Sequence, residues 1–177
     1  MVHPDYQYDP TLLPDLIRPI EEDKADVVLG SRLMGKSPMM QGMPWWKYVS
    51  NRFLTALENR VFGLKLSEYH TGYRAYKRTA LENVNLMNSD KFVFDQEIIA
   101  QFVNGGYRID EVPVPTRYFP EASSASFVNS CIYGLSILVV LVRYMFHRQG
   151  WAKQRQFQGL KGRYEEIPPV ANHSSQA

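Results

Sequence analysis

One long apolar segment near the C-terminus constrains the fold of this chain most. The segment "FVNSCIYGLSILVVLVRYMFHR", Phe127–Arg148, is predicted to be a helix. A helix of roughly 20 apolar residues can cross a bilayer, but Asn129, Ser130, Ser136 and Arg143 interrupt this one. Three arrangements therefore stay open: an interfacial or hairpin-like membrane helix, a helix buried or docked against the protein, and a true membrane span.

A basic run overlaps the end of this segment. From Arg143 to Arg163 the chain holds six Lys or Arg and no acid, with Trp151 and Phe157 between them. Basic residues interleaved with aromatic ones are typical of segments that bind an anionic membrane surface. The polar stretch "PPVANHSSQA" that ends the chain is expected to be disordered.

The composition sets broad limits. A chain of 177 residues forms one domain or two small ones, and 45% hydrophobic residues indicate a real core. The net charge of +2 is too small to argue for nucleic acid as a partner. Cys131 is the single cysteine, so an internal disulfide is excluded and a reducing compartment is the natural interpretation.

The order of helical and extended patterns predicts an α/β fold. Helices are expected at Thr11–Lys24, Trp45–Gly63 and Lys91–Gly106, and strands at Ala25–Gly30 and Tyr107–Pro115. Loops are expected at 31–44 and 64–78. The second helix should bury an apolar stripe made of Trp46, Val49, Phe53, Leu57 and Val61, with Gly63 as its C-cap. Ile109, Val112 and Val114 are expected on one side of the second strand.

The opening stretch "HPDYQYDP" offers a set of metal ligands. In an extended segment His3, Asp5 and Gln7 project to one side, offering one nitrogen and two oxygens, a set that suits Mn²⁺ or Mg²⁺. The alternative is a turn followed by a helix start, with Asp9 as N-cap and Pro10 at the first helical position. Both interpretations can hold for different residues.

Five motifs, in order and spacing, resemble the second half of a family-2 glycosyltransferase. They are "HPDYQYDP", "ADVVLGSR", "HTGYRAYKR", "FDQEI" and "GYRIDEVPVPTRY", within residues 2–127. The branch most similar is that of the dolichol- or polyprenyl-phosphate sugar transferases. The resemblance implies the GT-A fold, a mixed α/β sheet with flanking helices that binds a nucleotide sugar and a divalent metal. It also implies a hexosyltransferase that inverts the sugar configuration.

The resemblance assigns roles to individual residues. Asp5 and Gln7 match the acidic metal motif, and His3 stands where the family has another aspartate. Arg32 matches an arginine that meets phosphate, and Arg117 one on a loop that closes over donor and acceptor phosphates. After Arg117 this sequence has "FPEASSASF" where the family has a Gly-x-Ser-Lys type segment.

The remaining assignments concern the segment "SEYHTGYR". Glu68 occupies the place of an aspartate four residues before the glycine, and would orient or deprotonate the acceptor. His70 is the rival base, since its reference pKa is near neutral; a solvated loop histidine is the alternative. Arg74 is expected near the site as a phosphate-binding residue, or else as the partner of Glu68 in a structural salt bridge.

The family comparison also predicts how the chain is organised. Residues 1–126 are expected to be the C-terminal part of a GT-A domain, 127–150 an apolar helix in contact with membrane or protein, and 151–177 a basic, then polar, disordered tail. The half that binds the nucleotide base is expected to precede this chain.

The expected function is glycosyl transfer from a nucleotide sugar to an acceptor such as a polyprenyl phosphate. It would take place in the cytoplasm or at the cytoplasmic face of a membrane. The alternative is a non-catalytic remnant that associates with membrane or protein.

Overall fold

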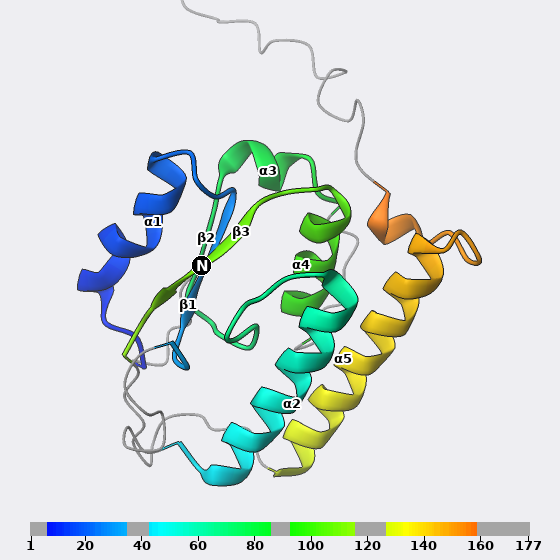
Figure 1. Ribbon diagram of the computed structural model, residues 1–177, viewed down its shortest axis with the longest axis horizontal. Coiled ribbons are helices and arrows are strands. Elements are labelled where there is room, and N and C mark those ends of the chain that lie inside the picture. Colours follow the sequence, from blue (N-terminus) through cyan, green and yellow to red (C-terminus); the bar gives the residue numbers. More distant parts are fainter. Residues whose placement is uncertain (1–6, 35–42, 86–92, 116–126, 159–177) are drawn as a thin grey trace, which may run out of the picture.

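The structure is a computed structural model that describes residues 7–34, 43–85, 93–115 and 127–158. A three-stranded sheet has β1 (Val27–Ser31) between β2 (Arg74–Tyr76) and β3 (Ile109–Pro113). β1 runs antiparallel to β2 and parallel to β3. Helix α1 (Leu13–Glu21) covers one face, and α4 (Phe94–Asn104), α2 (Trp45–Phe62) and α5 (Phe127–Arg148) lie on the other (Figure 1). This mixed architecture confirms the α/β fold class.

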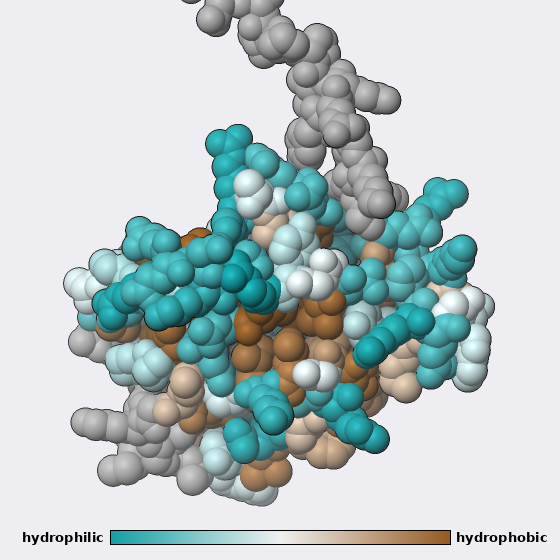
Figure 2. All heavy atoms as spheres, turned by 45° about the horizontal axis from the view of Figure 1, so that its top comes forward, coloured by the Kyte–Doolittle hydropathy of each residue, from teal (hydrophilic) through white to brown (hydrophobic). Residues whose placement is uncertain are grey.

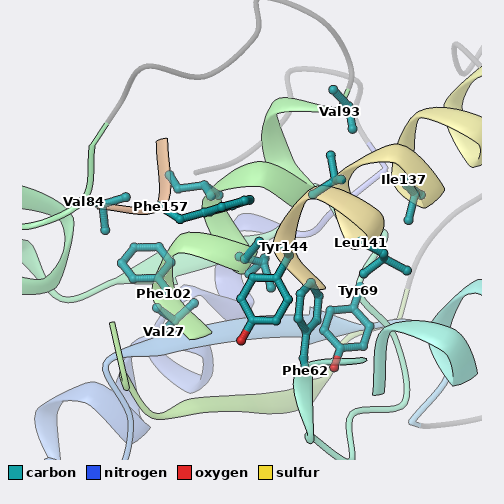
Figure 3. Packing of buried hydrophobic residues seen from close by; sticks show 14 of the residues in the cluster. Val27, Phe62, Tyr69, Val84, Val93, Phe102, Ile137, Leu141, Tyr144 and Phe157 are labelled. Carbon is teal, nitrogen blue, oxygen red and sulfur yellow. The ribbon is translucent and has the colours of Figure 1, made fainter. Parts of the chain in front are cut away.

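The alternation of side chains along β1 divides the core in two. Val27 and Leu29 point into the larger cluster, together with Phe102 of α4 and Tyr144 of α5. Val28 points the other way, into a smaller cluster closed by α1. Figure 3 shows the larger cluster, where the ring of Phe62 meets Tyr144 edge-on at 5.1 Å between centroids.

Strand β3 lies where it was predicted, but its expected apolar side is wrong. Ile109 packs against the larger cluster, and Val112 and Val114 belong to the smaller one. The reason is the period of two: positions 109 and 112 are an odd number of residues apart, so their side chains leave the strand on opposite faces.

Helix α2 has the predicted bounds, and Gly63 ends it with a left-handed φ of 75°. The predicted stripe is only partly buried. Leu57 and Val61 pack against the larger cluster, whereas the side chains of Val49 and Phe53 are 55% and 61% exposed. The buried positions of this helix are Asn51, Thr55, Glu58 and Phe62. A largely polar face therefore points inward.

Helix α5 is present with the predicted bounds and docks against α4 and α2. Its buried residues are Ile137, Val140, Leu141 and Tyr144. A second apolar face is exposed and consists of Val128, Ile132, Leu135, Val139, Val142, Met145 and Phe146. Cys131 is exposed on the same helix. Within the described residues this helix is long and apolar enough to cross a membrane, by length and composition alone.

Shorter elements complete the fold. The 3-10 helix η1 (Pro10–Leu12) begins at Asp9, whose carboxylate accepts a hydrogen bond from Thr11 N at 2.9 Å, so the predicted N-cap is confirmed. β2 lies in a segment expected to be loop. α3 (Arg78–Glu82) follows β2, and η3 (Arg155–Phe157) follows α5. Apolar side chains also gather near the middle of the face shown in Figure 2, framed by hydrophilic ones.

Candidate functional site

A buried carboxylate stands at the centre of the candidate site. Glu68, in the loop between α2 and β2, has no exposed surface. Its Oε2 accepts a hydrogen bond from the backbone N–H of Arg32 at 2.8 Å. Its Oε1 accepts one from Arg32 Nε at 2.8 Å and another from Asn51 Nδ2 at 2.8 Å. Glu68 thus joins the end of β1 to the polar face of α2.

These contacts decide the charge of Glu68. Burial alone would raise the pKa of its carboxyl group, because a charge is poorly solvated inside the protein. The positive charge of Arg32 and the hydrogen bonds from Arg32 and Asn51 outweigh this, so the pKa of Glu68 is lowered below its ordinary value. An ionised carboxylate with a lowered pKa is a weak base.

Arg32 follows β1 directly, and its side chain is 13% exposed. The guanidinium forms an ion pair with Glu68 and donates from Nη2 to the carbonyl oxygen of His70 at 2.7 Å. These bonds hold the planar guanidinium of Arg32 in one orientation at the edge of the site. The structure therefore brings together Arg32 and Glu68, which the sequence singled out separately.

His70 is buried rather than solvated, with an 8% exposed side chain. Its Nδ1 lies 3.1 Å from Asn51 Oδ1 and its Nε2 lies 3.0 Å from Glu58 Oε2. Sequence reasoning missed Asn51 and Glu58. The available signal was three polar residues at positions 51, 55 and 58 of a helix, which is the spacing of one helical face.

A second polar network fixes the C-terminal end of β1. Ser67 donates from its backbone N and from Oγ to the Glu111 carboxylate, both at 2.7 Å. Because Ser67 Oγ already donates to Glu111, Ser31 Oγ is the donor in the 2.6 Å bond between the two serines. Strands β1 and β3 and the loop that contains Glu68 are thereby tied together.

The opening segment lies beside the turn that follows Glu68. The ring of Tyr8 stacks on Tyr73 at 5.3 Å between centroids, and its hydroxyl accepts a hydrogen bond from Gly72 N at 3.2 Å. Gln7, which is half-buried, precedes this anchor. The other two predicted metal ligands, His3 and Asp5, lie outside the described residues, as does Arg117.

Of the expected metal ligands, only Gln7 falls in the described ranges. Within those ranges, no three or more His, Cys, Asp or Glu gather in a metal-binding group.

Arg74 is 1% exposed and donates to the carbonyl oxygens of Thr71, Asp95 and Tyr69 at 2.7, 2.9 and 2.9 Å. Its guanidinium also lies 3.6 Å from the Asp95 carboxylate. Arg74 thus braces the loop that carries Glu68.

Comparison with known proteins relates the sequence of this chain to a family. Residues 1–84 match the model of glycosyl transferase family 2. The low-salt glycan biosynthesis hexosyltransferase of Haloferax volcanii is 30% identical over 150 residues, which cover 83% of this chain and 36% of that protein. The polyprenol monophosphomannose synthase of Mycolicibacterium smegmatis is 27% identical over 92 residues, which cover 51% of this chain and 34% of that protein.

A third relative is a UDP-N-acetylglucosamine–dolichyl-phosphate N-acetylglucosaminyltransferase of Methanococcus voltae. It is 28% identical over 130 residues, which cover 72% of this chain and 51% of that protein. The chain thus spans 34% to 51% of the length of these three relatives. No solved structure matches the chain significantly.

The family match covers every residue of the network around Glu68: Arg32, Asn51, Glu58, Glu68 and His70. The mixed sheet with helices on both faces fits the GT-A-like fold of that family. Residues 1–84 of this chain therefore belong to glycosyl transferase family 2.

Proposed function

We propose that the protein containing this chain transfers a sugar from a nucleotide-sugar donor to a lipid phosphate of the polyprenyl or dolichyl type, with inversion at the sugar. Family membership and the names of the relatives support transfer of a sugar. The observation that carries the choice of acceptor is the lowered pKa of the clamped Glu68.

The argument rests on what each acceptor requires. A hydroxyl acceptor must lose its proton as it attacks, so it needs a general base with a pKa near the working pH. A phosphate monoester has a second pKa of about 6 and is already anionic at neutral pH. Its oxygen can attack the anomeric carbon directly while the nucleotide diphosphate leaves. Glu68 is poorly suited to the first task, and an anionic acceptor makes that task unnecessary.

Glu68 then acts as a positioning residue. It holds the Arg32 guanidinium in one orientation through the bonds described above. A guanidinium donates charge-assisted hydrogen bonds to phosphate oxygens. Arg32 is assigned to phosphate, and Arg117 would add a second positive charge from the segment after β3. Arg74 bonds the loop that carries Glu68 to Asp95 of α4, and its role is to hold that loop in place.

A divalent ion fits the donor chemistry. His3, Asp5 and Gln7 would hold Mn²⁺ or Mg²⁺, and such an ion neutralises the charge on a departing diphosphate. Tyr8 supplies the anchor of this segment, since its ring and hydroxyl fix it against Tyr73 and Gly72.

The helix pair α2 and α5 supports contact with a membrane. Both expose apolar side chains, and the single acid in their sequences, Glu58, is buried. Exposed Arg52, Arg60, Arg143 and Arg148 accompany these apolar faces. Helices that combine an exposed apolar face with exposed basic residues suit an anionic lipid surface. The protein is thus proposed to lie peripherally on the cytoplasmic face, where a lipid phosphate is presented.

The test uses the protein at its natural length, in membranes supplied with radiolabelled UDP- and GDP-sugars. Polyprenyl phosphate and polyprenol are compared as acceptors, and lipid-extracted label is counted. We expect label on the phosphate and none on the alcohol. Arg32→Lys and Glu68→Gln should lower transfer by about 100-fold or more, since small misplacements in a site cost that much.

The matched control is Glu21→Gln, which changes an exposed acid on α1 and should leave transfer unchanged. Equal transfer to polyprenol would refute the phosphate acceptor. Absence of transfer from every donor would refute the enzyme and favour the non-catalytic alternative, a module that associates with membrane through α5.

A further inference from the structure

Glu58 is a buried acid that the proposed transfer does not use. It has no exposed surface, and neither of its carboxylate oxygens has a hydrogen-bond partner among the described residues. The imidazole of His70 lies beside it, with Nε2 3.0 Å from Glu58 Oε2 but without hydrogen-bond alignment. A buried carboxylate is costly unless something compensates it, so its retention calls for an explanation.

The direction of the neighbouring hydrogen bonds fixes one proton on His70. The ionised Glu68 can only accept, so the group of Asn51 that lies 2.8 Å from it must be the amide nitrogen. The amide oxygen of Asn51 then faces His70 Nδ1 at 3.1 Å. It also accepts from Thr55 Oγ1 at 3.2 Å. Since an amide oxygen cannot donate, His70 Nδ1 must carry a hydrogen.

The other ring nitrogen does not fix a proton. His70 Nε2 lies 3.0 Å from Glu58 Oε2, but the two atoms are not aligned for a hydrogen bond. Glu58 therefore borders the ring on its far side, and the hydrogen on Nδ1 is the one that the contacts establish. Tyr133 contacts the imidazole edge-on, and burial raises the pKa of its phenol to about 12, so it stays neutral.

We propose that His70 is the positioning residue for Glu68 and Arg32. The hydrogen on His70 Nδ1 orients the Asn51 amide, the Asn51 nitrogen then donates to Glu68, and Glu68 orients the Arg32 guanidinium. Glu58 borders the far side of the ring at 3.0 Å. The consequence for sugar transfer rests on the proposed function; the arrangement itself does not.

Two amide substitutions test the chain of bonds. In His70→Asn the side-chain nitrogen takes the place of Nδ1 and can still donate to Asn51. In His70→Gln it reaches the place of Nε2 and can donate only to Glu58. Both variants remove the ring and introduce the same functional group. They differ in the one hydrogen bond that the proposal requires.

The readout is nitrogen-15 NMR of the labelled 177-residue chain. In the native chain, the His70 ring should show a protonated Nδ1, and the Nε–H of Arg32 should exchange slowly with water. We expect His70→Gln to speed this exchange by about tenfold or more, the value of one hydrogen bond to a charged group. His70→Asn should stay within about twofold of the native rate, because its donor to Asn51 is retained.

Two results would overturn the proposal: a bare Nδ1 in the native spectrum, or the same Arg32 exchange rate in both variants. Thermal unfolding followed by circular dichroism confirms that each variant is folded. In the transfer assay, His70→Gln should lower kcat with little change in donor KM, and His70→Asn should restore it. If NMR supports the network while no donor gives transfer, the proposed function fails and the positioning role stands.

Discussion

Glu68 carries a negative charge at a position with no exposed surface. Because its pKa is lowered below the ordinary value of 4.5 in the folded chain, the unfolded chain binds its proton more readily. The ionised carboxylate therefore stabilises the fold fully above that ordinary value. This contribution is lost as the pH falls through the lowered pKa of the folded state.

Glu68→Gln should destabilise the chain by about 3 kcal/mol at neutral pH, because it leaves Arg32 without its charged partner in a largely buried place. The difference between variant and native chain should shrink as the pH falls through the lowered pKa of Glu68, where the native carboxylate also becomes protonated. Urea unfolding at neutral pH and at successively lower pH measures this, with Glu21→Gln as the exposed control. A difference that does not change with pH would contradict the ionised state of Glu68.

At the level of elements, the limits of sequence reasoning are clearest in α2. Its length and its C-cap at Gly63 could be predicted, because helical period and left-handed glycine are local properties. Its buried face could not, because Asn51 and Glu58 are compensated by Glu68 and His70 from a separate loop. β2 was missed for a related reason: it is only three residues long, and its pairing with β1 defines it.

In the candidate site, too, some features could be predicted from the sequence and others only from the structure. Motif resemblance identified Arg32 and Glu68, but only the tertiary structure shows that they bind each other. The same holds for Arg74, whose hydrogen bonds to backbone carbonyl groups leave no trace in a side-chain pattern. The metal-ligand prediction stays a prediction, since His3 and Asp5 lie outside the described residues.

Strand β1 has room for glycine alone at position 30. A Cβ atom there would lie 2.8 Å from Val114 Cγ2 and 3.2 Å from the carbonyl oxygen of Tyr73. Gly30→Ala should thus destabilise the fold by about 1–3 kcal/mol. The control is Gly134→Ala in α5, where the new atom meets only Leu54 at 3.7 Å; it should stabilise by about 0.5–1 kcal/mol. Chemical denaturation measures both, and equal effects would contradict the close packing at β1.

The exposed face of α5 predicts binding to lipid. The 177-residue chain should sediment with vesicles that contain anionic lipid, and less so at high salt. Replacing both Leu135 and Val139 by Gln should weaken this binding by about tenfold or more, since each apolar side chain contributes on the order of 1.5–3 kcal/mol when buried. Leu13→Gln alters an exposed leucine of α1 and should have no effect.

A charge variant separates the two parts of this binding. Changing Arg143 and Arg148 to Gln should weaken binding to anionic vesicles by about 1 kcal/mol per charge. Binding to neutral vesicles should not change. If the native chain binds neither anionic nor neutral vesicles and stays monomeric, the role of α5 is to pack against the rest of the fold. The lipid acceptor would then lose its support from this surface.

At the scale of the whole molecule, the segment after α5 folds back over the core. Phe157 is 3% exposed and packs edge-on against Tyr144 at 5.8 Å. Asn104 at the end of α4 donates from Nδ2 to the carbonyl oxygen of Phe157 at 2.7 Å. Residues 151–158, the described part of a tail that was expected to be disordered, are thus ordered and pack against α4 and α5.

Phe157→Ala should lower the free energy of unfolding by about 3–5 kcal/mol, the usual cost of removing a buried aromatic ring. Trp151→Ala removes a larger ring from the same segment, but this ring is 73% exposed, so its cost should stay below about 1 kcal/mol. Thermal and urea unfolding measure both. Similar losses in the two variants would show that Phe157 does not anchor the segment.

The position of Cys131 makes the protein easy to observe. It is the only cysteine of the chain, and it is exposed on the helix whose outer face is apolar. A maleimide dye or nitroxide can therefore be attached at one known point without first removing other thiols. The colour of the dye, or the collision rate of the nitroxide with dissolved oxygen and with a water-soluble nickel complex, reports whether that point lies in water or in lipid. A label on the native Cys131 can thus measure how deeply α5 enters a bilayer.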